Sequence, residues 1–168
     1  AQFTLVAAMN PCPCGYYNVE KYKGRCECPI WKVQRYYKKL SGPLLDRIDI
    51  HLRIEPVDYK SLTGRKVVGE SSAEVRKRVN AAYDFQKKRF EGLKIRKNVE
   101  MDSILVEKLC PLEPAAKTLL DRAANQLNLS ARSYFKAIKV SRTIADLGQE
   151  EVVGSKHVAE AIQYLGDA

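Results

Sequence analysis

The 168-residue sequence lacks the features that would place it in a membrane or outside the cell. No apolar run approaches the roughly 20 residues that a membrane-spanning helix needs. The first residues, AQFTLVAAM, have no basic start and lead directly into Asn-Pro-Cys, so no signal peptide is apparent. Five cysteines without such a signal suit a reducing compartment, where disulfides are rare. We therefore expect a cytoplasmic protein with no membrane partner.

Internal repeats and low-complexity tracts are also missing, and the apolar fraction of 45% is normal for a folded chain. Acidic residues are outnumbered, which gives a formal net charge of +9. The surplus is uneven: residues 20–47 hold eight Lys/Arg and three acids, and residues 84–97 hold six and two. Anionic partners such as nucleotides or nucleic acid would suit this charge, and two solvated basic faces are the alternative.

The first apolar segment, residues 3–9, is a short run without alternation. Such a run is typical of a strand buried on both faces, as in a parallel sheet. Asn10 follows at its carboxyl end, where open α/β sheets bind their ligands, and Pro11 turns the chain away. Because the sequence starts with Ala1 inside this predicted strand, we expect an excised fragment.

Four of the five cysteines form two tight pairs, separated by the eleven residues between Cys14 and Cys26. Four thiolates in two nearby pairs can close a tetrahedral zinc site, and the loop is too short to build a core of its own. A disulfide-bonded loop and four free thiols remain alternatives, since zinc knuckles more often use C-x-x-C than C-x-C. The predicted ligands are Cys12, Cys14, Cys26 and Cys28. The fifth cysteine, Cys110, is expected to be a buried apolar residue.

A short amphipathic helix is predicted over residues 30–40, ended by Ser41-Gly42-Pro43. Apolar residues then alternate with polar ones from Ile48 to Ile54, which indicates a second strand with one buried face. Arg47 stands at the entry to this strand. From the residues alone, the alternative is a surface salt bridge from Arg47 to Asp46 or Asp49.

Beyond Pro56 the pattern changes. The pattern predicts a linker or a short strand over residues 57–69 and only helices after it. The expected helices cover about 73–90, 101–109, 112–127, 131–147 and 155–165. Serines are the expected caps: Ser71 or Ser72 for the first, Ser130 for the fourth and Ser155 for the last. Their apolar positions are those of a helical-bundle core.

Arg132 departs from ordinary helix design because it lies in the first turn after the cap Ser130. A cation there opposes the helix dipole, typically by a few tenths to about 1 kcal/mol. An anion at that helix end would reverse the effect, because the free N–H groups and the arginine would bind it together. An exposed side chain pointing into solvent is the alternative.

Three motifs in this order, NPCPCG, LSGPLLDRIDIH and LSARSYFKAIKVSRTIADL, closely resemble the C-terminal half of the magnesium-chelatase-like AAA+ ATPases of the ComM/YifB group. The resemblance covers nearly the whole chain. The chelatase ATPase subunit itself is similar around LLDR and in the helical lid but lacks the paired-cysteine insert, which favours the ComM type.

This resemblance implies the fold: an α/β remnant of a AAA+ core, with two strands and a cysteine-rich insert, followed by an all-α lid. The expected domains are 1–56 with the insert at 12–28, a linker at 57–70, and a lid at 71–168. The implied oligomer is a ring of copies of the chain, a hexamer, that binds ATP and Mg²⁺ and acts on DNA.

The resemblance also implies roles for the three polar residues. Asn10 matches the sensor 1 position, which orients the attacking water beside the γ-phosphate. Arg47 matches the arginine finger, which reaches the neighbouring subunit's nucleotide. Arg132 matches sensor 2, which contacts a phosphate of the bound nucleotide. Arg142 is a further basic candidate, expected to be more structural.

A phosphate-cradling loop, G-x-x-x-x-G-K-[ST], and an acidic magnesium-binding segment are both missing from the 168 residues. In the family these parts precede the sensor 1 strand, so the fragment alone should not hydrolyse ATP. Two other functions remain open: a chelatase-type motor that acts on a protein partner, and a stand-alone zinc-stapled module that binds nucleic acid.

Overall fold

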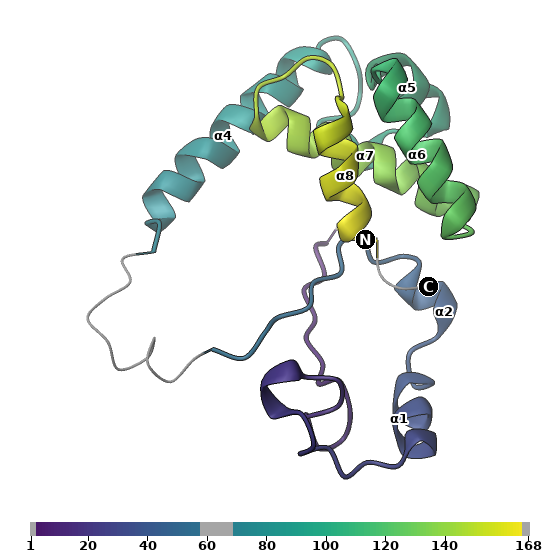
Figure 1. Ribbon diagram of the computed structural model, residues 1–168. Helices are drawn as coiled ribbons and strands as arrows, with labels where there is room; N and C mark the ends of the chain where they lie inside the picture. Colours follow the sequence, from purple (N-terminus) through teal and green to yellow (C-terminus); the bar gives the residue numbers. More distant parts are fainter. Residues whose placement is uncertain (1–2, 58–68, 166–168) are drawn as a thin grey trace. The chain divides into compact units, whose positions relative to one another are not determined.

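The computed structural model describes residues 3–57 and 69–165 (Figure 1). Within these ranges the chain forms seven α-helices and two short 3-10 helices. It divides into two compact units, which we describe separately. The first contains the described residues up to Leu45 together with Arg53–Val57. The second contains Asp46–Leu52 and the described residues from Gly69 onward.

The prediction of an α/β remnant is wrong, because no strand is formed within residues 3–57 and 69–165. Residues 3–9 and the segment from Ile48 to Ile54 have no regular secondary structure, and most of their side chains are exposed. A strand is stable only when its backbone groups pair with a neighbouring strand. The apolar patterns of both segments fit a sheet, but the described chain supplies no partner strands for one.

The first unit is built from short elements. Its helices are the 3-10 helix η1 (Glu20–Tyr22), α1 (Ile30–Tyr37) and α2 (Gly42–Leu45). Helix α1 lies inside the predicted range 30–40, with Pro29 at its N-cap. Val33 is the buried residue of α1 and, with Cys12, one of the few buried apolar residues of this unit.

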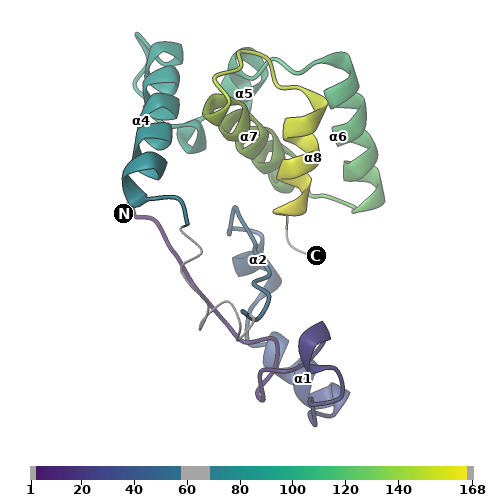
Figure 2. The same cartoon turned by 60° about the vertical axis from the view of Figure 1, so that its left-hand side comes forward.

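The second unit is helical, as the sequence predicts. Its helices are α4 (Ser72–Arg89), η2 (Asn98–Glu100), α5 (Ser103–Leu109), α6 (Pro114–Gln126), α7 (Ala131–Leu147) and α8 (Ser155–Gln163). Helix α7 packs against α4, α5 and α8, and α8 also packs against α6 (Figures 1 and 2). Helix α7 is therefore the central element of this unit.

Side-chain caps fix where several of these helices begin. Ser71 forms a capping box with Glu74 at the start of α4, and Ser130 accepts from the N–H of Ser133 at the start of α7. Both agree with the sequence prediction. The start of α8 differs, because the cap is Gly154, whose N–H donates to Nδ1 of the buried His157 at 2.9 Å, and Ser155 is already helical.

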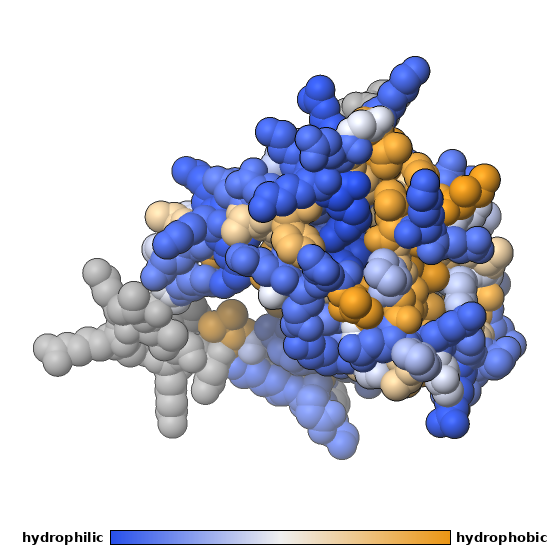
Figure 3. Space-filling view, turned by 90° about the horizontal axis from the view of Figure 1, so that it is seen from above, coloured by the Kyte–Doolittle hydropathy of each residue, from blue (hydrophilic) through white to orange (hydrophobic). Residues whose placement is uncertain are grey.

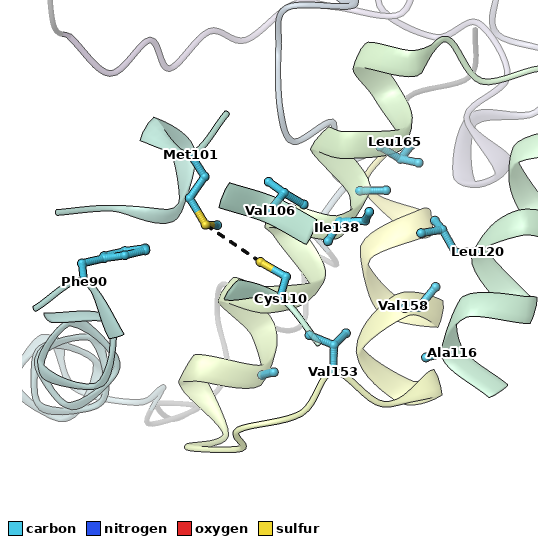
Figure 4. Packing of buried hydrophobic residues seen from close by; sticks show 12 residues of the cluster. Phe90, Met101, Val106, Cys110, Ala116, Leu120, Ile138, Val153, Val158 and Leu165 are labelled. Atoms are coloured by element: carbon cyan, nitrogen blue, oxygen red, sulfur yellow. Dashed lines mark hydrogen bonds between the residues drawn. The ribbon is translucent and has the colours of Figure 1, made fainter. Parts of the chain in front are cut away.

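The core of the second unit is one apolar cluster drawn from α5, α6, α7 and α8 and from connecting residues such as Phe90, which directly follows α4. Leu120, Val106, Val153 and Val158 are at most 1% exposed. The Cys110 thiol points toward the sulfur of Met101 at 4.0 Å (Figure 4). Burial raises the pKa of Cys110 to about 11. These facts confirm Cys110 as a buried apolar residue rather than a reactive one.

A buried polar network crosses this core. Arg142 and Asp146, one turn apart on α7, are fully buried, and Nε of Arg142 donates to Asp146 at 3.0 Å. Arg89 and Asn98 also donate to the Asp146 carboxylate, at 3.0 and 2.8 Å. Arg142 donates further to the carbonyls of Glu150 and Glu151. Arg142 is therefore structural, as expected from the sequence.

Apolar side chains are also exposed on the second unit. Ile50, Leu52, Val140, Ile144 and Leu147 line an open groove of about 420 Å³. Figure 3 shows one face of the molecule, on which hydrophobic residues gather in a patch bordered by hydrophilic ones. No helix in the described part of the chain is both long and apolar enough to cross a membrane.

The Asp146 network predicts a large effect of Asp146→Ala. Removing the carboxylate leaves Arg142 buried without its counter-charge, so we expect the free energy of unfolding to fall by about 3–5 kcal/mol. The measurement is urea unfolding followed by circular dichroism. Asp121→Ala is the control, since Asp121 accepts one hydrogen bond from Tyr134 at an exposed position and its loss should cost about 1 kcal/mol or less. Equal losses in the two variants would contradict this account of the network.

Candidate functional site

The four cysteines of the first unit lie together. Their sulfur atoms are all within 4.8 Å of one another, and three of the separations are short: 3.2 Å for Cys12–Cys14, 3.6 Å for Cys14–Cys26 and 3.8 Å for Cys12–Cys26. Zinc–sulfur bonds of about 2.3 Å arranged as a tetrahedron place the sulfurs about 3.8 Å apart. The cluster thus has the four donor atoms of a tetrahedral zinc site, at separations that lie around this value.

Local turns bring the two pairs together. The N–H of Gly15 donates to the carbonyl of Cys12 at 3.0 Å, which closes a tight turn with Gly15 at a φ of 84°. A second turn has Gly24 at a φ of 83°, just before Cys26. Positive φ angles of this size are easily adopted only by glycine. The N–H of Tyr17 then donates to the Cys12 sulfur at 3.3 Å.

The thiols of this cluster influence one another. Burial opposes ionisation of Cys12, but hydrogen bonds from Cys14 and from the backbone N–H of Tyr17 outweigh it and lower its pKa. The pKa of Cys28 is raised by its hydrogen bond with Cys14, and further by burial and by the neighbouring Cys12. The Cys12 thiolate therefore makes Cys26 and Cys28 harder to ionise. A bound cation would remove that repulsion.

The three predicted nucleotide-contacting residues fall in different units. Asn10 is exposed and ends the extended segment of the first unit. Arg47 and Arg132 both belong to the second unit, and both are exposed. Arg132 occupies the first turn of α7, as predicted. Arg47 lies in a turn directly after Asp46.

The turn that carries Arg47 is held on the N-terminal part of α7. The Ser133 hydroxyl donates to the Asp46 carboxylate at 2.6 Å. The Lys136 ammonium donates to the backbone carbonyls of Ile48 at 3.0 Å and Asp46 at 3.4 Å. Further along, the N–H of His51 donates to the carbonyl of Tyr164, at the end of α8, at 2.9 Å.

Asp46 is the anion at the start of α7. Its hydrogen bond from Ser133 lowers its pKa, and the positive charges of Lys136, Arg132 and Arg47 lower it further. Both predicted nucleotide-contacting arginines therefore act on one carboxylate. This gives a physical reason for a cation at the start of α7, since Asp46 offsets the unfavourable interaction of Arg132 with the helix dipole.

Sequence reasoning missed Ser133 and Lys136. Ser133 is the fourth residue of the SARS motif and looks like an ordinary first-turn polar residue. Lys136 is 9% exposed, a degree of burial that lysine rarely reaches without partners. The burial of Lys136 could have been predicted from its position among the apolar residues of the 131–147 helix, because that position places the lysine on the buried side.

The fold and site define a protein with a helical bundle that holds two arginines close to one carboxylate, and a separate unit with a four-cysteine cluster. Two family models match the chain in succession: "Magnesium chelatase, subunit ChlI" over residues 1–62 and "Magnesium chelatase, subunit ChlI C-terminal" over residues 69–165. The second covers more than half of the chain. The chain therefore belongs to the magnesium chelatase family.

Curated relatives agree with this assignment. The chain is 37% identical to competence protein ComM of Haemophilus influenzae and 39% identical to YifB of Escherichia coli, in each case over 98% of the chain and 31% of the relative. YifB of Salmonella typhimurium is 36% identical over the same shares. The resemblance to the ComM/YifB group is confirmed. The chain spans 31% of the length of these relatives.

The contact between Ser133 and Asp46 predicts a titration shift. Because the hydroxyl favours the ionised carboxylate, Ser133→Ala should raise the pKa of Asp46 toward its ordinary value, as measured by NMR of the carboxyl carbon. The lowered pKa of Asp46 in the folded chain means that this contact stabilises the fold above the ordinary pKa of aspartate, and that the stabilisation is lost as pH falls through the lowered value.

Thr118→Val is the matched control, since the Thr118 hydroxyl donates to its own helix at the Pro114 carbonyl. The Asp46 titration should be the same in this variant as in the unmodified chain. An unchanged Asp46 titration in Ser133→Ala would contradict the contact.

Proposed function

We propose that the chain is the distal part of a AAA+ ATPase of the ComM type, which forms a ring and remodels DNA with energy from ATP. Residues 1–56 would belong to the ATPase core and residues 71–168 to the helical lid, joined by a linker at 57–70, most of which lies outside the described residues. Membership of the magnesium chelatase family and the similarity to a competence protein support this proposal.

The observation that carries the proposal is the attachment of the Arg47 turn to α7. An arginine finger must be held at a fixed position to stabilise the charge that develops during phosphoryl transfer. Ser133 and Lys136 supply such a support through Asp46 and the backbone carbonyls on either side of Arg47. Arg132 lies near the same carboxylate, so one helix supports both residues.

Each residue has a separate role in this mechanism. Arg47 stabilises the transferring phosphoryl group in the neighbouring subunit, and Arg132 binds a phosphate as sensor 2. Asn10 donates or accepts a hydrogen bond that orients the attacking water. ATP with Mg²⁺ would be cradled by a phosphate loop and an acidic segment, which are not among the 168 residues. We therefore expect the chain by itself not to hydrolyse ATP.

A second proposal concerns the four cysteines. Cys12, Cys14, Cys26 and Cys28 would bind one Zn²⁺ as thiolates, and the ion would hold a loop that has almost no apolar core. The support is the set of sulfur–sulfur distances, which lie around the value for a tetrahedral site. The metal would be structural, because all four positions are filled by cysteine and none is left for substrate.

The full-length protein should hydrolyse ATP, and DNA should accelerate the reaction. Arg47→Ala should reduce turnover by about 10³-fold or more while leaving nucleotide affinity nearly unchanged, because the finger acts on the transition state. The measurements are steady-state hydrolysis with and without DNA, and equilibrium binding of a fluorescent ATP analogue.

Arg76→Ala, which removes another exposed arginine from α4, is the control and should leave turnover unchanged. Normal turnover in Arg47→Ala would refute the finger assignment. Hydrolysis that responds to a protein partner but not to DNA would favour the chelatase-type motor.

Elemental analysis of the purified chain should find about one zinc per molecule. Cys26→Ser should lose most of the metal, because a hydroxyl is a poor ligand for zinc. Cys110→Ala should keep all of it, since Cys110 lies in the core of the other unit. A chain that contains no zinc after expression in zinc-rich medium would show that the cluster is a group of free thiols.

A further inference from the structure

The surface of α1 combines positive charge with exposed rings. Residues 28–45 contain four basic residues and no acidic one. The basic residues are Lys32, Arg35, Lys38 and Lys39, and all four are exposed. Trp31, the only tryptophan of the chain, is 60% exposed beside them, and Tyr37 is 44% exposed. Rings of this size are normally well buried, so their exposure beside these basic residues indicates a binding surface.

Helix α1 also borders a surface depression. Tyr17, Ile30, Val33, Gln34, Tyr37 and Lys38 line an open depression of about 570 Å³. Its lining includes Val33, which is 2% exposed, together with two tyrosines and a lysine. Apolar and aromatic lining residues can accept the face of a base, and a lysine among them can bind a phosphate.

The four-cysteine cluster fixes Tyr17 and the start of α1, which both border this depression. The backbone N–H of Tyr17 donates to the Cys12 sulfur, and Cys28 is followed directly by Pro29, the N-cap of α1. The positions of Tyr17 and of the helix start are thus both set by the cluster. A surface fixed in this way loses little entropy when a flexible strand binds to it.

Cations lie over aromatic rings at two places in the described part of this unit. The Lys39 ammonium lies 5.8 Å from the centre of the Tyr36 ring, and the Arg25 guanidinium lies 5.3 Å from that of Tyr22. Tyr16 packs edge-on against Tyr22 at 5.2 Å. Proteins that bind single strands combine these elements: basic groups for the phosphates and ring faces for the bases.

We propose that the surface formed by Tyr17 and α1, with Trp31, Tyr37, Lys32 and Lys38 as its principal contacts, binds single-stranded nucleic acid by stacking bases on its rings. This inference rests on the proposed action on DNA and specifies the surface and the form of DNA.

A duplex fits less well, because its bases are already stacked on one another and offer no free faces to Trp31 or Tyr37. An anionic membrane fits less well, because the buried residue of α1, Val33, already packs within the unit.

The test uses the fluorescence of Trp31, which reports on its own surroundings without interference from other tryptophans. The purified 168-residue chain is titrated with an oligothymidylate, with a duplex of equal length, and with vesicles of phosphatidylserine and phosphatidylcholine. Stacking predicts quenching of Trp31 by the single strand, tighter binding of the strand than of the duplex, and affinity that falls as salt rises.

Variants assign the contacts. Trp31→Ala should weaken binding of a labelled strand, measured by anisotropy, by about 5- to 100-fold, as should Tyr37→Ala, while Trp31→Phe should retain most of the affinity. Lys38→Gln should reduce the salt dependence. Tyr83→Ala, at a tyrosine of α4 that is 41% exposed, is the matched control and should bind like the unmodified chain. Zinc content and circular dichroism establish that each variant is folded.

Three results would overturn the inference: unchanged Trp31 fluorescence with the strand, equal affinity for the duplex, or a response to vesicles alone. Failure here is separable from failure of the proposed function. DNA-stimulated hydrolysis by the full-length protein without Trp31 quenching refutes only the surface. Quenching by the strand without ATP hydrolysis in the full-length protein refutes only the ATPase.

Discussion

The structure of the helical unit depends on the neutralisation of one buried carboxylate, Asp146. A lone buried charge is costly, and this one is tolerated because Arg142, Arg89 and Asn98 all donate to it. These contacts join α7 to α4 and to the segment before α5, and Arg142 ties α7 to the loop that leads into α8. The network therefore fixes α7, the helix that contacts most of the others.

The candidate nucleotide-contacting residues depend in turn on α7. Its first turns carry Arg132 and Ser133, and Lys136 follows one turn later. Through Ser133 and Lys136 the helix holds Asp46 and the carbonyls around Arg47. Both arginines are consequently attached to the same helix. In the proposed ATPase, this connection would link the position of the lid to the position of the finger.

The helices could be predicted from the sequence because their signals are local. Ser71 with Glu74, and Ser130 at the start of α7, cap helices through groups only three residues apart. The cysteine cluster was also predictable, because the turns that position the two C-x-C pairs are formed by residues close to them in the sequence. The prediction of two strands was wrong because a strand requires partner strands, which lie far away in sequence. The described part of the chain forms no such partner strands. The contacts of Ser133 and Lys136 span about ninety residues, and local periodicity does not reveal such pairs.

We propose that Arg47 acts on the nucleotide of a neighbouring subunit while α7 holds it in place. The most direct measurement is a structure of the full-length oligomer with a transition-state analogue of ATP hydrolysis. We expect the Arg47 guanidinium to contact the analogue bound to the adjacent subunit and Ser133 still to donate to Asp46. An oligomer in which Arg47 lies away from every phosphate would contradict it.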